Sequence, residues 1–130
     1  MAQIGYVCLG SNDFDRACGF YDALTTELGG KRLFPTPHGQ MYRLGSGAMI
    51  MVTRPYNEEA SHPGNGTMMA INVDAQEDVA RVYDKAISLG ATCEGKPGPR
   101  MAFGDFAYFR DLDGNKIAVF FSAQQAQKKQ

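Results

Sequence analysis

The chain has 130 residues, of which 44 % are hydrophobic and 21 % charged, proportions that are ordinary for a globular protein of one-domain size. Its net charge of −1 argues against nucleic acid as a partner, because phosphate contacts need a surplus of Lys and Arg. The apolar runs are strand-length, far short of the roughly 20 residues that cross a bilayer. With no basic segment or cleavage site at the N-terminus, the sequence predicts a cytoplasmic protein with no membrane partner.

The first half of the chain begins with an apolar run, Ile4–Leu9, that predicts a strand. Ser11-Asn12-Asp13 supplies residues that cap a helix, and apolar side chains then recur every three or four positions as far as Leu28. Gly29-Gly30 ends that helix, since glycine tolerates the left-handed conformation. Three short extended runs separated by Pro- and Gly-containing turns follow it: Lys31–Phe34, Gln40–Leu44 and Ala48–Thr53.

The second half repeats this order. Thr67–Val73 predicts a strand, Asp74 is a candidate cap, and a helical stripe runs to Gly90. Tyr21-Asp22 recurs as Tyr83-Asp84, and the same offset pairs Tyr6 with Met68. Short strands again follow: Thr92–Glu94, Phe106–Arg110 and Lys116–Ser122, with Lys96-Pro97-Gly98-Pro99 and Asp113-Gly114-Asn115 as the turns between them. The repetition indicates an internal duplication.

These features predict one α+β domain, residues 1–125, made of two tandem βαβββ modules. Module one spans about 2–55, a linker 56–66 rich in Asn, Glu, Pro and Gly follows, and module two spans 67–122. The polar end of the chain, 123–130, is expected to be a frayed tail.

Three segments, FYDALTTELGG, GNGTMMAINV and YFRDLDGNKIAVFF, together with the duplicated layout, resemble the vicinal-oxygen-chelate superfamily. That family includes glyoxalase I, extradiol dioxygenases, fosfomycin-resistance enzymes and bleomycin-binding proteins. The resemblance covers residues 4–122. It implies paired modules whose curved sheets form a glyoxalase-like half-barrel cleft, often completed by a homodimer, with a divalent metal in catalytic members.

The resemblance also implies metal ligands on the first and last strands of each module, typically His or Gln and Glu. In this chain the corresponding residues are Tyr6, Met51, Met68 and Ala118. Alanine cannot ligate, and a thioether is a poor ligand for hard divalent ions. We therefore expect no metal and no cofactor. His38 and His62 lie in Pro/Gly-rich loops, away from the strands expected to line the cleft, and are interpreted as surface residues.

The expected lining of the cleft follows from strand periodicity and from the resemblance. Side chains on one face of a strand recur every second residue, and thioethers with aromatic rings form adaptable apolar pockets. Arg100 precedes a segment that in relatives forms a loop over the ligand, and an arginine there can hold an anion. The sequence is also compatible with a simpler interpretation, in which the apolar candidates are ordinary core residues and Arg100 is a solvated surface residue. The candidates are Tyr6, Cys8, Met51, Met68, Arg100, Phe103, Tyr108 and Ala118.

Two functions remain open. The first is a glyoxalase-like domain that binds a small, partly apolar or aromatic molecule without chemistry. The second is a glyoxalase-type lyase, isomerase or dioxygenase with an unusual metal site or metal-free acid–base chemistry, in which Tyr6 acts on a proton. The three cysteines, Cys8, Cys18 and Cys93, lack the number and spacing of a disulfide framework and are interpreted as small core residues.

Overall fold

The computed structural model describes residues 1–45 and 47–128. The chain divides into two compact units, Met1–Pro63 and Gly64–Gln130, and each is described here by itself. The division falls inside the segment 56–66 that the sequence predicts as a linker. No helix in the described ranges is long and apolar enough to cross a membrane.

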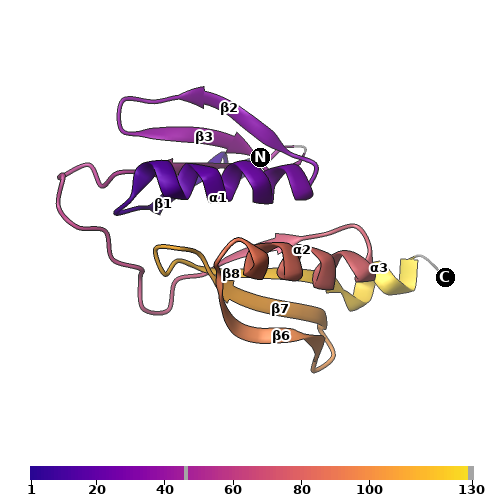
Figure 1. The fold of residues 1–130 in the computed structure, drawn as a ribbon. Helices are drawn as coiled ribbons and strands as arrows, with labels where there is room; N and C mark the ends of the chain where they lie inside the picture. Colours follow the sequence, from indigo (N-terminus) through magenta and orange to yellow (C-terminus); the bar gives the residue numbers. More distant parts are fainter. Residues whose placement is uncertain (46, 129–130) are drawn as a thin grey trace. The chain divides into compact units, whose positions relative to one another are not determined.

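The first unit is a βαβββ module, as its sequence predicts (Figure 1). Its four-stranded sheet has the order β1-β4-β3-β2, with β1 parallel to β4 and the other neighbours antiparallel. The elements are β1 Tyr6–Gly10, α1 Phe14–Glu27, β2 Lys31–Pro35, β3 Gly39–Arg43 and β4 Met49–Thr53. The strand of the opening run, the helix and the three following strands thus appear in the expected order.

Helix α1 covers one face of the first sheet, and its ends follow local chemistry. The Asp13 side chain accepts from Arg16 N at 3.3 Å and caps the N-terminus. The apolar stripe of the helix packs on β2, β3 and β4. Tyr42 of β3 is fully buried there, with its hydroxyl within hydrogen-bond reach of Cys18 O at 3.1 Å and Asp22 Oδ1 at 2.8 Å. Burial and these hydrogen bonds raise the pKa of Tyr42.

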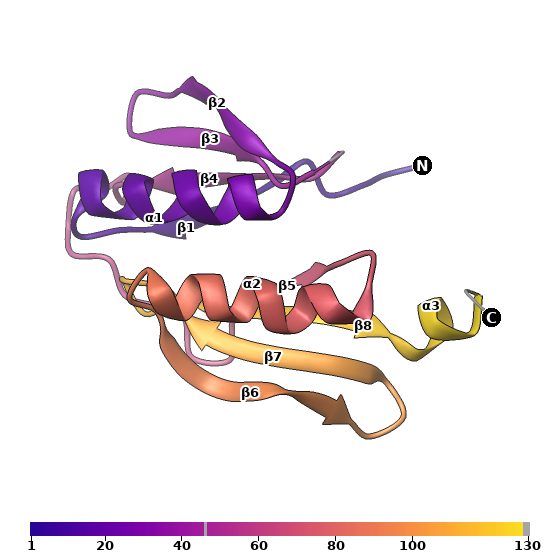
Figure 2. The same ribbon diagram turned by 45° about the vertical axis from the view of Figure 1, so that its right-hand side comes forward.

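The second unit repeats the module (Figure 2). Its sheet has the order β5-β8-β7-β6, with β5 parallel to β8 and the remaining pairs antiparallel. The elements are β5 Met69–Asn72, α2 Gln76–Ser88, β6 Thr92–Arg100, β7 Gly104–Arg110, β8 Lys116–Ser122 and α3 Ala123–Lys128. Together the units confirm the α+β class and the two tandem βαβββ modules.

Helix α2 covers one face of the second sheet and packs on β6, β7 and β8. The strand residues on the covered face are fully or almost fully buried: Ala107, Phe109, Ile117, Val119 and Phe121. Alternate residues of the same strands point to the other face and are half-exposed in several cases, as the period of two requires. Tyr83 of this helix is buried. Its pKa is raised to about 12, mainly by a side-chain hydrogen bond with Cys93 and to a smaller extent by desolvation.

Three local expectations differ from the structure. The residue at the N-terminus of α2 is Ala75, with no side-chain cap, so Asp74 does not fill that role. Lys96-Pro97-Gly98-Pro99 is not a turn but part of β6. This strand lies at the edge of its sheet and carries two register irregularities, the setting in which a strand tolerates proline.

The end of the chain is the third difference. Residues Ala123–Lys128 form the short helix α3, which contacts β7 and β8, in place of the frayed tail expected there. Gln125 anchors it: its Oε1 accepts from Asn72 Nδ2 at 2.6 Å and from Ser122 N at 2.8 Å, and its Nε2 donates to Val73 O at 3.0 Å. Residues 129 and 130 lie outside the described residues.

Candidate functional site

The uncovered face of the first sheet carries three of the predicted site residues. Tyr6 and Cys8 are exposed on β1, and Met51 is half-exposed on β4, between the buried Ile50 and Val52. Cys8 lies directly opposite Met51 in the parallel pairing of the two strands. The period of two that buries Ile50 and Val52 under α1 turns Met51 to the other face.

A pocket of about 480 Å³ opens on this face. Its size and largely apolar lining are typical of a site for a small organic molecule. The lining residues are Tyr6, Cys8, Thr36, Pro37, His38, Met51, Thr53, Arg54 and Tyr56. The structure therefore brings Tyr6, Cys8 and Met51 into one pocket, and we name it the Met51 pocket.

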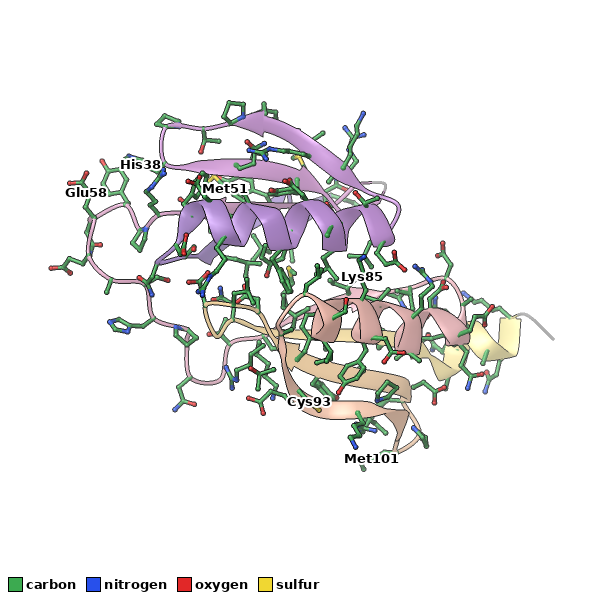
Figure 3. The ribbon with its side chains drawn as sticks, in the orientation of Figure 1. His38, Met51, Glu58, Lys85, Cys93 and Met101 are labelled. Carbon is green, nitrogen blue, oxygen red and sulfur yellow. The ribbon has the colours of Figure 1, made fainter. Side chains whose placement is uncertain are left out.

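His38 lines this pocket, so the expectation that it lies away from the lining strands is wrong. Figure 3 labels His38 and Met51 in the first unit. The turn Thr36–Gly39 joins two neighbouring strands and lies against the end of β4. There the His38 carbonyl accepts from Arg54 N at 2.9 Å and Thr53 Oγ1 at 3.2 Å. The His38 ring contacts Tyr56 edge to face, with 5.7 Å between centroids. The pairing of β3 with β4 creates this proximity, and no local sequence signal indicates it.

The mouth of the Met51 pocket adds polar groups to its apolar wall. Thr36 Oγ1 lies 3.4 Å from Met51 Sδ. The Arg54 guanidinium lies over the Phe14 ring, 4.2 Å from its centroid, which fixes the cation beside His38. A second hollow of about 350 Å³ shares His38 and Arg54 and is lined further by residues such as Asn12 and Glu58. The first sheet thus presents a thiol, a phenol and an imidazole around one apolar space.

The second unit holds the other predicted residues. Tyr108 on β7 lies directly opposite Ala118 on β8, and the Arg100 guanidinium lies 5.6 Å from the Tyr108 centroid. Ala118 is fully buried, so it contributes space and no exposed surface. Phe103, 65 % exposed, belongs to the turn between β6 and β7, and Met68, 44 % exposed, immediately precedes β5. Arg100, Tyr108 and Ala118 therefore gather on one sheet face, whereas Phe103 and Met68 lie at its connections.

The positions expected for metal ligands carry few suitable donors. Cys8 faces Met51 in the first unit, and Ala70 faces Ala118 at the register-equivalent place in the second. Within residues 1–45 and 47–128, no group of three or more His, Cys, Asp or Glu side chains is arranged to hold a metal ion.

Comparisons with known proteins agree with this architecture. A family model described as the Glyoxalase/Bleomycin resistance protein/Dioxygenase superfamily matches residues 3–119. A glyoxalase/bleomycin resistance protein from Albidiferax ferrireducens is similar at 31 % identity, with a TM-score of 0.81 over 91 % of this chain and 97 % of that one. No curated protein matches the chain.

More distant structures share the fold. A variant of the fosfomycin resistance protein FosX from Listeria monocytogenes, complexed with Mn(II) and 1S,2S-dihydroxypropylphosphonic acid, has a TM-score of 0.75 at 14 % identity, covering 98 % of each chain. A lactoylglutathione lyase from Agrobacterium tumefaciens has a TM-score of 0.71 at 18 % identity, covering 95 % of this chain and 96 % of that one.

Proposed function

The chain belongs to the Glyoxalase/Bleomycin resistance protein/Dioxygenase superfamily, and from this membership and the Met51 pocket we infer that it binds a small, partly apolar or aromatic molecule. The pocket is the observation that carries the proposal. Its thioether and aromatic walls suit an apolar ligand, and Cys8, His38 and Arg54 supply the few polar groups that orient one.

We propose further that no divalent metal binds at the position usual for the family. The donor set supports this, because Ala118 has no donor atom and the thioethers of Met51 and Met68 prefer soft ions. The remaining candidate, Tyr6, ligates poorly while its phenol is protonated. Elemental mass spectrometry on protein purified without chelator is expected to find substoichiometric metal, unchanged after incubation with nickel, zinc, manganese or iron. Stoichiometric metal would contradict the proposal.

Ligand binding is tested by a thermal-shift screen of aromatic and cationic compounds, followed by calorimetry on the hits. A hit that occupies the Met51 pocket is expected to bind Met51→Glu at least about tenfold more weakly, a loss of roughly 1.4 kcal/mol, because a carboxylate in the apolar wall must be desolvated. Met49→Glu is the matched control, since Met49 lies on the same face of β4 but does not line the pocket. A screen without a single stabilising compound would count against a binding protein.

An enzyme of the glyoxalase type is the second candidate, and the imidazole of His38 favours it. His38 shares the Met51 pocket with the Tyr6 phenol and the Cys8 thiol, groups capable of proton transfer. Turnover of methylglyoxal–glutathione adducts, lost in both Tyr6→Phe and His38→Gln, would support catalysis. Failure across a panel of such substrates, with each metal supplied, leaves the binding protein as the function.

Two further proposals concern assembly. The family resemblance supports one cooperative domain that forms a homodimer. Light scattering is expected to give twice the monomer mass of 14.2 kDa, and a monomer at all concentrations would refute the dimer.

A further inference from the structure

The uncovered face of the second sheet carries a row of aromatic rings, distinct from the Met51 pocket. Phe106 stacks on Phe120 across the β7–β8 pairing, with centroids 4.9 Å apart and planes inclined by 9°. Phe106 also stacks on Tyr108, at 6.0 Å and 17°. All three rings are half-exposed, while their neighbours under α2 are buried. We name Phe106, Tyr108 and Phe120 the aromatic row.

Two cations adjoin the same row. Lys116 Nζ lies 5.4 Å from the Tyr108 centroid, and the Arg100 guanidinium carbon lies 5.6 Å from it. Lysine and arginine reach the row from different strands, β8 and β6. The combination of stacked rings with two adjacent cations complements a ligand that is aromatic at one end and anionic at the other.

Glycine in β6 makes room for this arrangement. A Cβ added at Gly95 would lie 2.8 Å from Tyr108 Cδ2, so that the ring would have to shift, and 3.2 Å from Arg100 Nη2, a tight contact. At Gly98 it would meet Arg100 Nη1 at 3.4 Å. The Arg100 guanidinium is held beside these glycines by two hydrogen bonds, which it donates to Lys96 O at 2.7 Å and to Pro99 O at 3.2 Å. The guanidinium is therefore positioned beside Tyr108 before any ligand arrives.

Neither cation forms a direct ion pair with another of the described residues. Glu94, a carboxylate on the same strand as Arg100, pairs with Arg110 instead. The pKa of Glu94 is lowered mainly by its hydrogen bond to Arg110 and, to a smaller extent, by the charge of Lys116. Arg100 and Lys116 both retain N–H groups for an incoming anion.

We propose that the aromatic row is a binding site for an arene carboxylate, whose ring packs against Phe106 and Phe120 and whose carboxylate is held by Arg100 and Lys116. The inference goes beyond the proposed function, because it adds to the Met51 pocket a second binding site with a stated class of ligand. Charge-assisted hydrogen bonds to the carboxylate select the anion over a neutral arene. The charges of Arg100 and Lys116 also favour this small anion over a second copy of the chain as the occupant.

The test compares 2-naphthoate with 2-naphthylmethanol, a neutral arene of similar shape. Protein carrying fluorinated tyrosine is titrated with each and followed by fluorine NMR, with the Tyr108 signal assigned from Tyr108→Phe. We expect the Tyr108 signal to move with 2-naphthoate, and the carboxylate to bind about tenfold more tightly than the alcohol at low salt. The preference is expected to shrink as salt rises, because exposed charges are screened.

Variants separate the contribution of the two cations from that of the aromatic rings. Arg100→Gln with Lys116→Gln is expected to abolish the preference for the carboxylate while leaving weak binding of both compounds. Phe106→Ala is expected to weaken the binding of both compounds. Gly95→Ala is expected to weaken the binding of the carboxylate by displacing Arg100. Lys85→Gln, on α2, is the matched control that removes one cation from the same unit and keeps the preference (Figure 3).

The outcomes distinguish this inference from the proposed function. Equal affinity for the two compounds, or a Tyr108 signal that stays still, overturns the arene-carboxylate site even if Met51-dependent binding persists. Loss of Met51-dependent binding with an intact Tyr108 response refutes the proposed pocket and leaves the site standing. If Phe106→Ala instead converts a dimer to a monomer and neither compound binds, the row is an interface between two copies and the inference is wrong.

Discussion

The two modules share their strand order and pairing register, but only one face of each sheet carries similar side chains. The pair Tyr42 and Ile50 in the first sheet has the same place as Phe109 and Ile117 in the second, on the face under the helix. Val52 and Val119 match likewise. Packing against a helix restricts these positions to apolar residues of suitable volume, whichever module they occupy.

The uncovered faces differ at most corresponding positions, although Arg43 and Arg110 occupy the same place. Gly39 stands where the second sheet has Phe106, Met41 where it has Tyr108, and Met49 where it has Lys116. The first face consequently has room for a pocket, and the second has a stacked row of rings. A common backbone therefore holds two chemically different surfaces, and the difference is located where no helix constrains the side chains.

The largest expected effect is a loss of unfolding free energy on truncation of the two helix-covered cores, and it shows whether they form one cooperative domain. Ile50→Ala and Ile117→Ala each remove a side chain that is at most 1 % exposed. Each is expected to cost about 2–5 kcal/mol, since the cavity is only partly refilled. Denaturant unfolding followed by far-ultraviolet circular dichroism is expected to show one transition that moves to lower denaturant in both variants. Two transitions, each sensitive to one variant, would show modules that unfold separately.

Exchanging the aromatic residues at the corresponding positions Tyr42 and Phe109 sharpens the comparison of the two cores. Phe109→Tyr introduces a hydroxyl into a fully buried position, at an expected cost of about 1–3 kcal/mol if no partner is found. Tyr42→Phe removes a hydroxyl that has partners on α1 and is expected to cost about 1 kcal/mol. Equilibrium unfolding measures both. No loss of stability in Phe109→Tyr would mean that the second core accommodates a hydroxyl as readily as the first.

Alkaline pH is expected to destabilise both modules through one buried tyrosine each. The pKa of Tyr42 and that of Tyr83 are raised in the folded protein, so both phenols ionise more easily after unfolding. Stability is therefore complete below the unfolded pKa of about 10 and falls as pH rises above it. For Tyr83 the fall ends near its folded pKa of about 12. Thermal unfolding between neutral and alkaline pH is expected to show a shallower decline in Tyr42→Phe and in Tyr83→Phe than in the parent protein.

The smallest effect concerns the equivalent arginines Arg43 and Arg110. Arg110 pairs with Glu94, whose pKa is thereby lowered, whereas Arg43 forms no ion pair among the residues that the structure describes. Glu94→Gln is expected to lower the melting temperature slightly at neutral pH, since exposed pairs contribute little. The difference should vanish in acid as pH falls below the usual glutamate value toward the lowered pKa, because the parent then loses the pair too. Arg43→Gln is expected to leave the melting temperature unchanged.

Much of the fold is predictable from local patterns. The apolar stripes up to Leu28 and Leu89 mark both helices, and Asp113-Gly114 marks the turn before β8, because these signals depend on residues close in sequence. The prediction is wrong at Pro97 and Pro99, where a turn was expected. Proline excludes a central strand only, and the edge position of β6 is a property of the assembled sheet.

The candidate site is predictable only in part. Alternation along β1 predicts that Tyr6 and Cys8 share a face, and the family resemblance adds Met51 to the same cleft; all three line one pocket. His38 is missed because its carbonyl meets Arg54 N only when β3 pairs with β4. The stacking of Phe106 on Phe120 likewise depends on the register between β7 and β8.

The amino-acid sequence by itself determines the duplicated βαβββ order, the helix-facing stripes and the lack of good metal donors at Ala118, Met51 and Met68. Each depends on residue type or on spacing within a segment. Only the tertiary structure places His38 in the Met51 pocket and Arg100 beside Tyr108. Those contacts join strands that are separate in the chain, and their register is set by the pairing of whole sheets and the packing of a helix on one face.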